Sequence, residues 1–168
     1  MDKILKTTLS GFGGTTFMTA ASALSSVMLK QNFREPEHLG TMIGRLAPFL
    51  SKRAQAIAGW GAHYGMGFVF AAVYVELWET GQIKHNLKNG LILGALSGVI
   101  GMLIWKGTFK VHPLPPFIKY TNFYIQRIPA HIVFAVFATI TYRLIKAQEE
   151  EKELALKAQV ERREDYHH

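Results

Sequence analysis

The sequence predicts an all-α integral membrane bundle of four transmembrane helices, with an interfacial amphipathic helix and a charged helical C-terminal tail. Charged side chains are absent from residues 7–29, 54–75 and 89–105, and Arg127 is the only one within residues 120–142. Each segment is about 20 residues long, which is the length a helix needs to cross the hydrocarbon core of a bilayer. A soluble four-helix protein would instead carry a charged stripe along each helix.

The composition narrows the classes of function. The 168 residues suffice for one domain, and we expect a transmembrane domain over residues 1–146 and a tail over residues 147–168. The chain has no cysteine, which excludes disulfides, thiolate metal sites and a cysteine nucleophile. The net charge of +7 comes from loops and tail, so a membrane protein is indicated and nucleic acid is not expected as a partner. No hydrolase triad, P-loop or dinucleotide fingerprint occurs. His167 and His168 are set aside because they resemble a tag remnant.

The first helix is expected over residues 8–29, as a retained span with no cleavable signal peptide. It is rich in small residues that allow close contact between helices, so we expect it to be buried against its neighbours. These residues are Gly11, Gly13, Gly14, Ala20, Ala21, Ser22, Ser25 and Ser26.

An amphipathic helix is predicted in the connection that follows, within residues 35–50. Apolar residues recur there at steps of three and four, with basic residues between them. That pattern is typical of a helix lying in the membrane interface. Pro48 is expected to bend or end it.

The second and third helices are expected over residues 54–79 and 87–105. Because the turn between them is short, we expect them to pack antiparallel. The third helix carries Gly90, Gly94 and Gly98 at four-residue spacing, followed by Gly101. Glycines at this spacing favour close packing against another helix, and a ligand groove is the alternative.

The fourth helix is expected to begin near Thr121 or Asn122, either of which can cap it, and to continue to about Lys146. Pro129 lies inside it and should kink it. The remaining tail is charged and favours a solvated helix, with Glu153 and Lys157 four residues apart.

The sequence resembles the YagU-like family of small bacterial inner-membrane proteins, whose biochemical role is not established. The resemblance covers residues 63–143 and rests on four features: His63 with Val69, Phe70, Ala71 and Tyr74 at matching offsets, "GLILGAL" at 90–96, "PLPPF" at 113–117, and Ala130 with His131. The chain departs from the family at Arg127, where the pattern has a glutamate. The resemblance implies an inner-membrane location with cytoplasmic termini.

An intramembrane polar cluster is the candidate site. His63 and His131 are expected at similar depth in the second and fourth helices, about 12 to 15 Å into the membrane. An unpaired imidazole is costly there, so we expect the two rings to face each other. Tyr64, Gln126 and Arg127 would complete the cluster.

Four interpretations of the two histidines stay open. They are a hydrogen bond between neutral rings, a bis-histidine haem site, a proton relay, and a zinc site for which no third ligand is evident. Arg127 would either extend to the membrane surface or contact an anion or lipid headgroup. On the opposite side of the membrane, Glu76 and Arg143 are expected to form an ion pair.

These features predict an integral inner-membrane protein with both termini in the cytoplasm and no enzymatic activity. Its expected role is that of a structural or accessory component, with the lipid bilayer and other membrane subunits, or further copies of itself, as partners. No cofactor is expected. The alternatives are a haem-b-binding electron-transfer subunit that uses His63 and His131, and a small transporter or proton-conducting protein.

Overall fold

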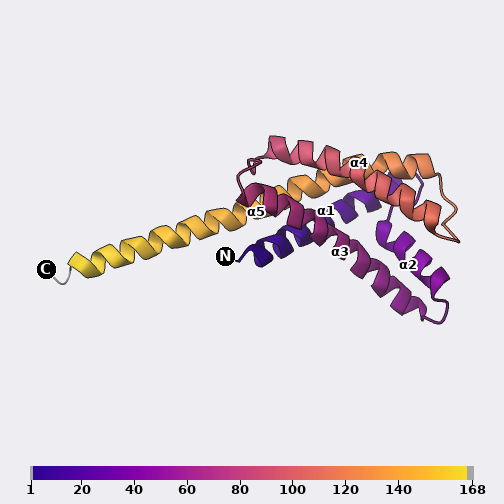
Figure 1. Cartoon of the computed structure of the whole chain (residues 1–168), viewed down its shortest axis with the longest axis horizontal. Helices are drawn as coiled ribbons and strands as arrows, with labels where there is room; N and C mark the ends of the chain where they lie inside the picture. Colours follow the sequence, from indigo (N-terminus) through magenta and orange to yellow (C-terminus); the bar gives the residue numbers. More distant parts are fainter. Residues whose placement is uncertain (1, 166–168) are drawn as a thin grey trace.

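The computed structural model describes residues 2–165, which form five α-helices and no strand (Figure 1). The helices are α1 (Lys3–Met28), α2 (Glu35–Leu46), α3 (Lys52–Glu79), α4 (Leu87–Val111) and α5 (Tyr120–Asp165). The predicted all-α class is therefore confirmed. His167 and His168 lie outside the described residues.

Three of these helices, α3, α4 and α5, are long and apolar enough to cross a membrane. The helix α1 has 26 residues but is not among them. Its many serine and threonine side chains lower its hydropathy. Three spans of the expected four are thus supported by length and composition.

The helices do not all pack in the order that the loops suggest. The helix α4 lies along α5, α1 lies along both α5 and α3, and α2 lies along α3. The expected antiparallel packing of α3 on α4 is wrong over most of their length. Near their common turn the Tyr74 hydroxyl lies 2.6 Å from Ser97 Oγ, and beyond this contact the two helices diverge (Figure 1).

The glycine face of α4 packs on the backbone of α5, which confirms the packing interpretation. A Cβ atom added at Gly98 would lie 2.6 Å from the Cα atom of Ile128. One added at Gly94 would lie 2.6 Å from the Cα atom of Ile132. Neither contact leaves room for a side chain, so the sequence spacing encodes this interface directly.

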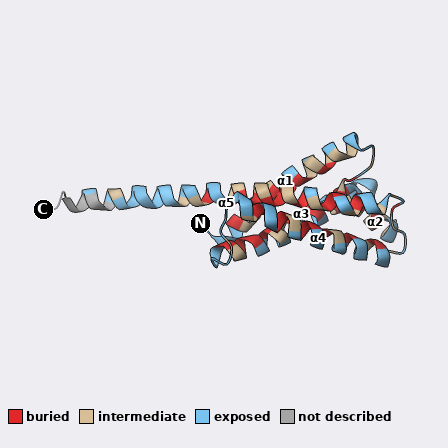
Figure 2. Ribbon diagram, turned by 90° about the horizontal axis from the view of Figure 1, so that it is seen from above, coloured by how far each residue is buried: buried red, intermediate tan, exposed pale blue. Residues whose placement is uncertain are grey.

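The small residues of α1 also serve packing, as predicted. A Cβ atom at Gly11 would lie 2.6 Å from the Phe68 ring of α3, and one at Gly14 would lie 2.8 Å from Phe134 of α5. The helix α1 is therefore wedged between α3 and α5. Figure 2 shows buried residues where these helices meet.

The helix α2 is amphipathic, as expected, and its buried face lies on α3. A Cβ atom at Gly59 would lie 2.3 Å from the carbonyl oxygen of Pro36 and 2.5 Å from the amide nitrogen of Gly40. The helix ends at Leu46, earlier than expected. Ala47 leaves the helical conformation (φ −127°, ψ 70°) because it precedes Pro48, which disfavours helix at the residue before it.

The helix α5 runs through Pro129 and continues without a break into the tail. It begins at Tyr120, so Thr121 and Asn122 lie inside its first turn and neither is its N-cap. Beyond the bundle the helix projects away from the other elements, and its described side chains are mostly exposed (Figures 1 and 2).

Candidate functional site

The centre of the site is an ion pair between Glu35 and Arg127, at the beginning of α2 and within α5. Arg127 Nη1 contacts Glu35 Oε1. The Arg127 side chain is 0% exposed and that of Glu35 is 5% exposed. Two charges removed from water are tolerated only when they are paired and hydrogen-bonded, so each residue requires the other.

The chain between α1 and α2 delivers Glu35 to this position. The backbone reverses at Lys30, whose φ of 49° is left-handed. Gln31 and Phe33 then donate their backbone N–H groups to the carbonyl oxygen (3.2 Å) and the side-chain hydroxyl (2.9 Å) of Ser26, respectively. This short connection turns back onto the bundle, so the first residue of α2 enters the interior.

Arg127 is held by more than its ion pair. Its Nη2 donates to the carbonyl oxygen of Phe33 at 3.0 Å and also contacts Gln126 Oε1, while its Nε donates to the carbonyl oxygen of Phe123 at 3.3 Å. The guanidinium also lies 4.2 Å from the centre of the Phe123 ring. Arg127 therefore does not extend out of the bundle, as the expected contact with the membrane surface requires, and it instead anchors the α1–α2 connection.

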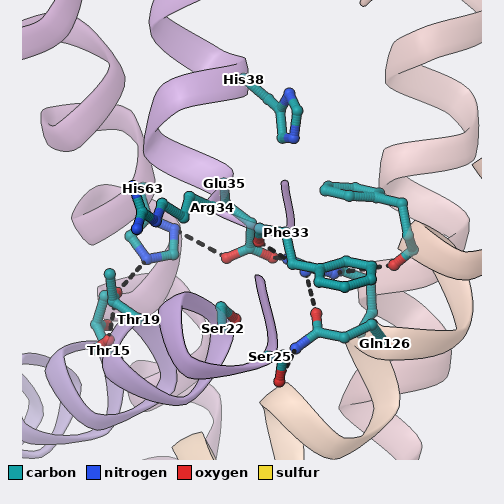
Figure 3. Close-up of polar contacts among 12 residues, drawn as sticks. Thr15, Thr19, Ser22, Ser25, Phe33, Arg34, Glu35, His38, His63 and Gln126 are labelled. Atoms are coloured by element: carbon teal, nitrogen blue, oxygen red, sulfur yellow. Dashed lines mark hydrogen bonds and ion pairs between the residues drawn. The ribbon is translucent and has the colours of Figure 1, made fainter. Parts of the chain in front are cut away.

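His63 of α3 is the third member of the cluster. Its Nδ1 lies 3.1 Å from Glu35 Oε2, and its Nε2 lies 2.8 Å from the hydroxyl of Thr19 in α1 (Figure 3). Glu35 thus contacts both His63 and Arg127, and we call these three residues the ionic cluster. Through Thr19 the ionic cluster connects four helices: α1, α2, α3 and α5.

The ionic cluster keeps the Glu35 carboxylate charged. Burial by itself would raise the pKa of Glu35. The Arg127 guanidinium, and after it the His63 ring, outweigh burial and hold this pKa well below its ordinary value. Glu35 is therefore a fixed anion in the interior of the bundle.

The expected contact between His63 and His131 is not present. No hydrogen bond joins the two rings in the described chain, although both border the same cavity. His63 is instead bound by Glu35 and Thr19. His131 lies against the edge of Phe70, with ring centres 4.9 Å apart, and points toward Gly101.

Gln126 joins the predicted cluster, whereas Tyr64 does not. Gln126 contacts Arg127, and its Nε2 donates to Ser25 Oγ at 3.4 Å (Figure 3). The Tyr64 hydroxyl lies 2.9 Å from Thr16 Oγ1 in an exposed position, and its ring stacks on Trp60. Tyr64 therefore ties α3 to α1 outside the ionic cluster.

Glu35 is the functional residue that sequence reasoning missed, because it lies in a segment read as an interfacial helix. A signal was available in the distribution of carboxylates. Between the two ends of the chain the acidic residues are Glu35, Glu37, Glu76 and Glu79. The last two lie at the far end of α3, so a buried Arg127 had only Glu35 and Glu37 as counterions on its own side.

The predicted pair of Glu76 and Arg143 is also replaced. Glu76 contacts Lys3 of α1 instead. Beside it, Lys6 lies 3.0 Å from both Glu79 and Glu149, and the Tyr142 hydroxyl donates to Glu79 at 2.7 Å. The polar groups at this end of the bundle therefore connect α1, α3 and α5.

A cavity of about 170 Å³ lies where α3 and α4 diverge. Its walls come from all five helices and are mostly apolar, with Glu35, His63 and His131 as the ionisable groups. The lining residues from α3 include Met66 and Phe70, and those from α4 include Gly101 and Ile104. The ionic cluster and His131 thus border a single apolar space.

The donor set does not match a bis-histidine haem site. Such a site needs a free ring nitrogen on each histidine, and both nitrogens of His63 are already engaged by Glu35 and Thr19. Gly59 and Gly67, one turn on either side of His63 in α3, leave no open slot for a haem, because helices α2 and α1 pack directly against them. Among residues 2–165 no group of three or more His, Asp or Glu side chains is arranged to hold a metal ion.

Comparisons with known proteins do not indicate a function, so the function is inferred from the geometry of the site. No protein-family model, curated protein or solved structure matches this chain.

Proposed function

We propose that this protein is a four-span integral membrane protein that acts, without catalysis, as a structural or accessory component of a membrane assembly. The observation that carries this proposal is the ionic cluster of Glu35, His63 and Arg127. Its members come from α2, α3 and α5 and are nearly or fully buried. With its internal charges paired and its hydroxyls largely bonded to its own backbone, the bundle suits a stable scaffold.

The helix α1 is proposed as the fourth span. Its 26 residues extend about 39 Å, which is long enough to cross a bilayer. Several of its hydroxyls donate to the carbonyl four residues earlier, as Thr8 does to Ile4 and Thr16 to Phe12, so they are satisfied within the helix. Its outer face presents exposed Phe12, Phe17 and Leu24, which suits contact with lipid.

Exposed apolar side chains on the other long helices also support a location in the membrane. Examples are Ile57 and Val69 of α3 and Leu96 and Leu103 of α4, each more than half exposed. A soluble protein rarely leaves so continuous an apolar surface uncovered. The resemblance to the YagU-like family supports the inner membrane of a bacterium as the location.

Cysteine labelling tests the four spans, because the chain has no native cysteine. Single cysteines at Asp2, Lys30, Lys84 and Phe117 sample the start of the chain and the loops after α1, α3 and α4. With cytoplasmic termini, an impermeant reagent added to intact cells should label positions 30 and 117 and leave 2 and 84 unlabelled. Labelling of positions 2 and 30 from the same side would exclude α1 as a span.

The accessory role is tested separately, by cross-linking in the native membrane followed by mild extraction. We expect the protein to migrate in a discrete complex larger than one chain, either with other membrane subunits or with further copies. A tail cysteine at the exposed Glu151 provides a cross-linking position outside the bundle. A protein that remains monomeric in the native membrane would contradict this part of the proposal.

Proton transport is the second candidate function, and one observation favours it. The Thr19 hydroxyl lies 2.7 Å from the carbonyl oxygen of Thr15 and 2.8 Å from His63 Nε2. Its single proton can serve only one of these acceptors, so His63 either accepts that proton or carries a second one of its own. Proteoliposomes with an internal pH dye test this, and we expect His63→Gln to abolish any proton flux that the protein supports. Absence of flux with the unmodified protein would exclude this function.

A further inference from the structure

His131 is the one ionisable residue at the cavity that the ionic cluster does not use. Its side chain is 4% exposed, and its Nδ1 is buried without a hydrogen-bond partner. Within the described residues, neither nitrogen of the His131 ring has a hydrogen-bond or ion-pair partner. A buried imidazole with no partner is costly, so a polar atom from a ligand would relieve that cost.

The ring is positioned at the cavity rather than inside the packed core. His131 and Gly101 both line the cavity, and a Cβ atom at Gly101 would lie 2.4 Å from His131 Nε2. The absence of a side chain at position 101 therefore makes room for the His131 ring itself, which packs against the backbone of α4 at the wall of the cavity. The edge contact with Phe70 fixes the ring from the α3 side.

The other two ionisable groups of the cavity are already satisfied. Glu35 contacts Arg127 and His63 through its two oxygens, and His63 contacts Glu35 and Thr19 through its two nitrogens. A polar group of a ligand would therefore find its partner at His131. Of the other lining residues, Met66 and Phe70 offer apolar contact, and the Thr108 hydroxyl already donates to the carbonyl oxygen of Ile104 at 2.9 Å. The Trp105 ring packs against Phe109 and Phe123.

The volume of the cavity limits the size of the ligand that it can bind. A dry apolar cavity of about 150 Å³ is known to accept one benzene molecule, and this cavity has about 170 Å³. It therefore accommodates a single six-membered ring with a small substituent. A charged headgroup is excluded, because no unpaired charge on the described lining residues would compensate its desolvation.

We propose that this cavity binds an uncharged, membrane-soluble molecule whose head is one six-membered ring bearing an oxygen, with that oxygen hydrogen-bonded to His131. The ligand enters from the bilayer where α3 and α4 diverge, past Met66 and Ile104, which are 43% and 39% exposed. This function goes beyond the accessory role proposed above and does not require it.

The experiment compares phenol with toluene, which has nearly the same shape but no oxygen. Binding of 4-fluorophenol and 4-fluorotoluene to the full chain in lipid nanodiscs is followed by ¹⁹F relaxation, and the saturable part is isolated by competition with unlabelled ligand. One hydrogen bond to a buried group favours phenol by roughly three- to tenfold in dissociation constant. Equal saturable binding of the two probes would overturn the role of His131.

Two substitutions in α4 locate the site. Gly101→Leu places a side chain where even a Cβ atom would overlap His131 Nε2, so it displaces the ring at the cavity wall and we expect saturable binding to be lost. Gly107→Leu is the matched control, because a Cβ atom there meets nothing within 4 Å, and it should bind as the unmodified protein does. Unchanged binding in Gly101→Leu would show that the probe binds elsewhere.

His131→Phe keeps an aromatic ring at the cavity and removes the polar atoms. We expect toluene still to bind and the preference for phenol to disappear. The helical content of each variant, measured by circular dichroism in the same nanodiscs, verifies that it is folded. A folded His131→Phe variant that retains the preference would overturn the proposal, as would a complete absence of saturable binding to the unmodified protein.

Discussion

At the scale of single residues, Arg127 determines where the α1–α2 connection and the start of α2 lie against α5. It is fully buried in α5 and contacts Glu35 as well as the carbonyl oxygen of Phe33, so it fixes both the end of the α1–α2 connection and the start of α2. A lone arginine in an apolar helix was ambiguous in the sequence. Its counterion gives it a structural role and removes the need for contact with the membrane surface.

Removing one partner of this ion pair should be strongly destabilising, because the other charge is then left buried alone. We expect Arg127→Met and Glu35→Gln each to lower the free energy of unfolding by about 3–5 kcal/mol, measured in mixed detergent micelles. Combining Glu35→Gln with Arg127→Met should cost less than the sum of the two single changes.

The matched control lies one residue from Glu35. Arg34 pairs with Glu37 at 2.9 Å, but both side chains are over 40% exposed. Arg34→Gln should change stability by no more than about 1 kcal/mol. If Arg127→Met proves as mild as Arg34→Gln, the ionic cluster does not hold α2 in place.

At the scale of helices, glycine spacing decides which elements lie together. The helix α4 carries its glycines on the face that meets α5, and this allows backbone contact between the two. The face of α4 toward α3 has no such contact, so the helices that a short turn connects diverge. The cavity is a direct consequence of this arrangement.

A pair of alanine substitutions in α4 tests this account. A Cβ atom at Gly98 would lie 2.6 Å from the Ile128 backbone, so Gly98→Ala should force α4 and α5 apart and cost about 1–3 kcal/mol. Gly107→Ala meets open space and should be neutral or stabilise by up to about 1 kcal/mol, because alanine favours helix. Urea unfolding of both variants in the same detergent provides the comparison. Equal effects would mean that close packing at Gly98 is not required.

At the scale of the whole molecule, the bundle and the tail share one continuous helix, α5, whose two parts lie in different environments. The helix α5 is buried among its neighbours before Lys146 and is mostly exposed beyond Glu150. Among the described residues, the ion pair with the bundle that lies nearest the C-terminus joins Glu149 to Lys6 of α1 at 3.0 Å. The contacts of α5 with the bundle therefore extend at least to Glu149.

Truncation after Glu150 should leave the stability of the bundle unchanged within about 0.5 kcal/mol, since surface changes away from packed groups have small effects. Truncation after Lys146 removes Glu149 as well and should cost more, because Lys6 is only 7% exposed and loses one of its two carboxylates. Thermal unfolding of both shortened proteins measures this difference. A large loss on removing residues 151–168 alone would show that the tail folds back on the bundle.

The sequence by itself determined the helical class, the approximate limits of the long helices and the face on which the glycines of α4 pack. These features depend on local patterns within one helix. Such patterns are the hydropathy of a segment, the spacing of its small residues and the position of its prolines. His63 was also identifiable as a polar residue that needed a partner. Because an unpaired imidazole is costly inside an apolar bundle, the sequence predicted that His63 belongs to a buried polar cluster.

Only the tertiary structure decided which partner each polar residue has. The sequence predicts His63 and His131 at the same depth and in contact. In the structure, Glu35 enters the interior at the start of α2 and binds His63 and Arg127 instead. Pairing of this kind depends on the direction of a connection and on the rotation of each helix about its axis. Neither leaves a periodic trace in the sequence. The divergence of α3 from α4, and with it the cavity at His131, has the same origin, because it reflects competition among all five helices for the same packing surfaces.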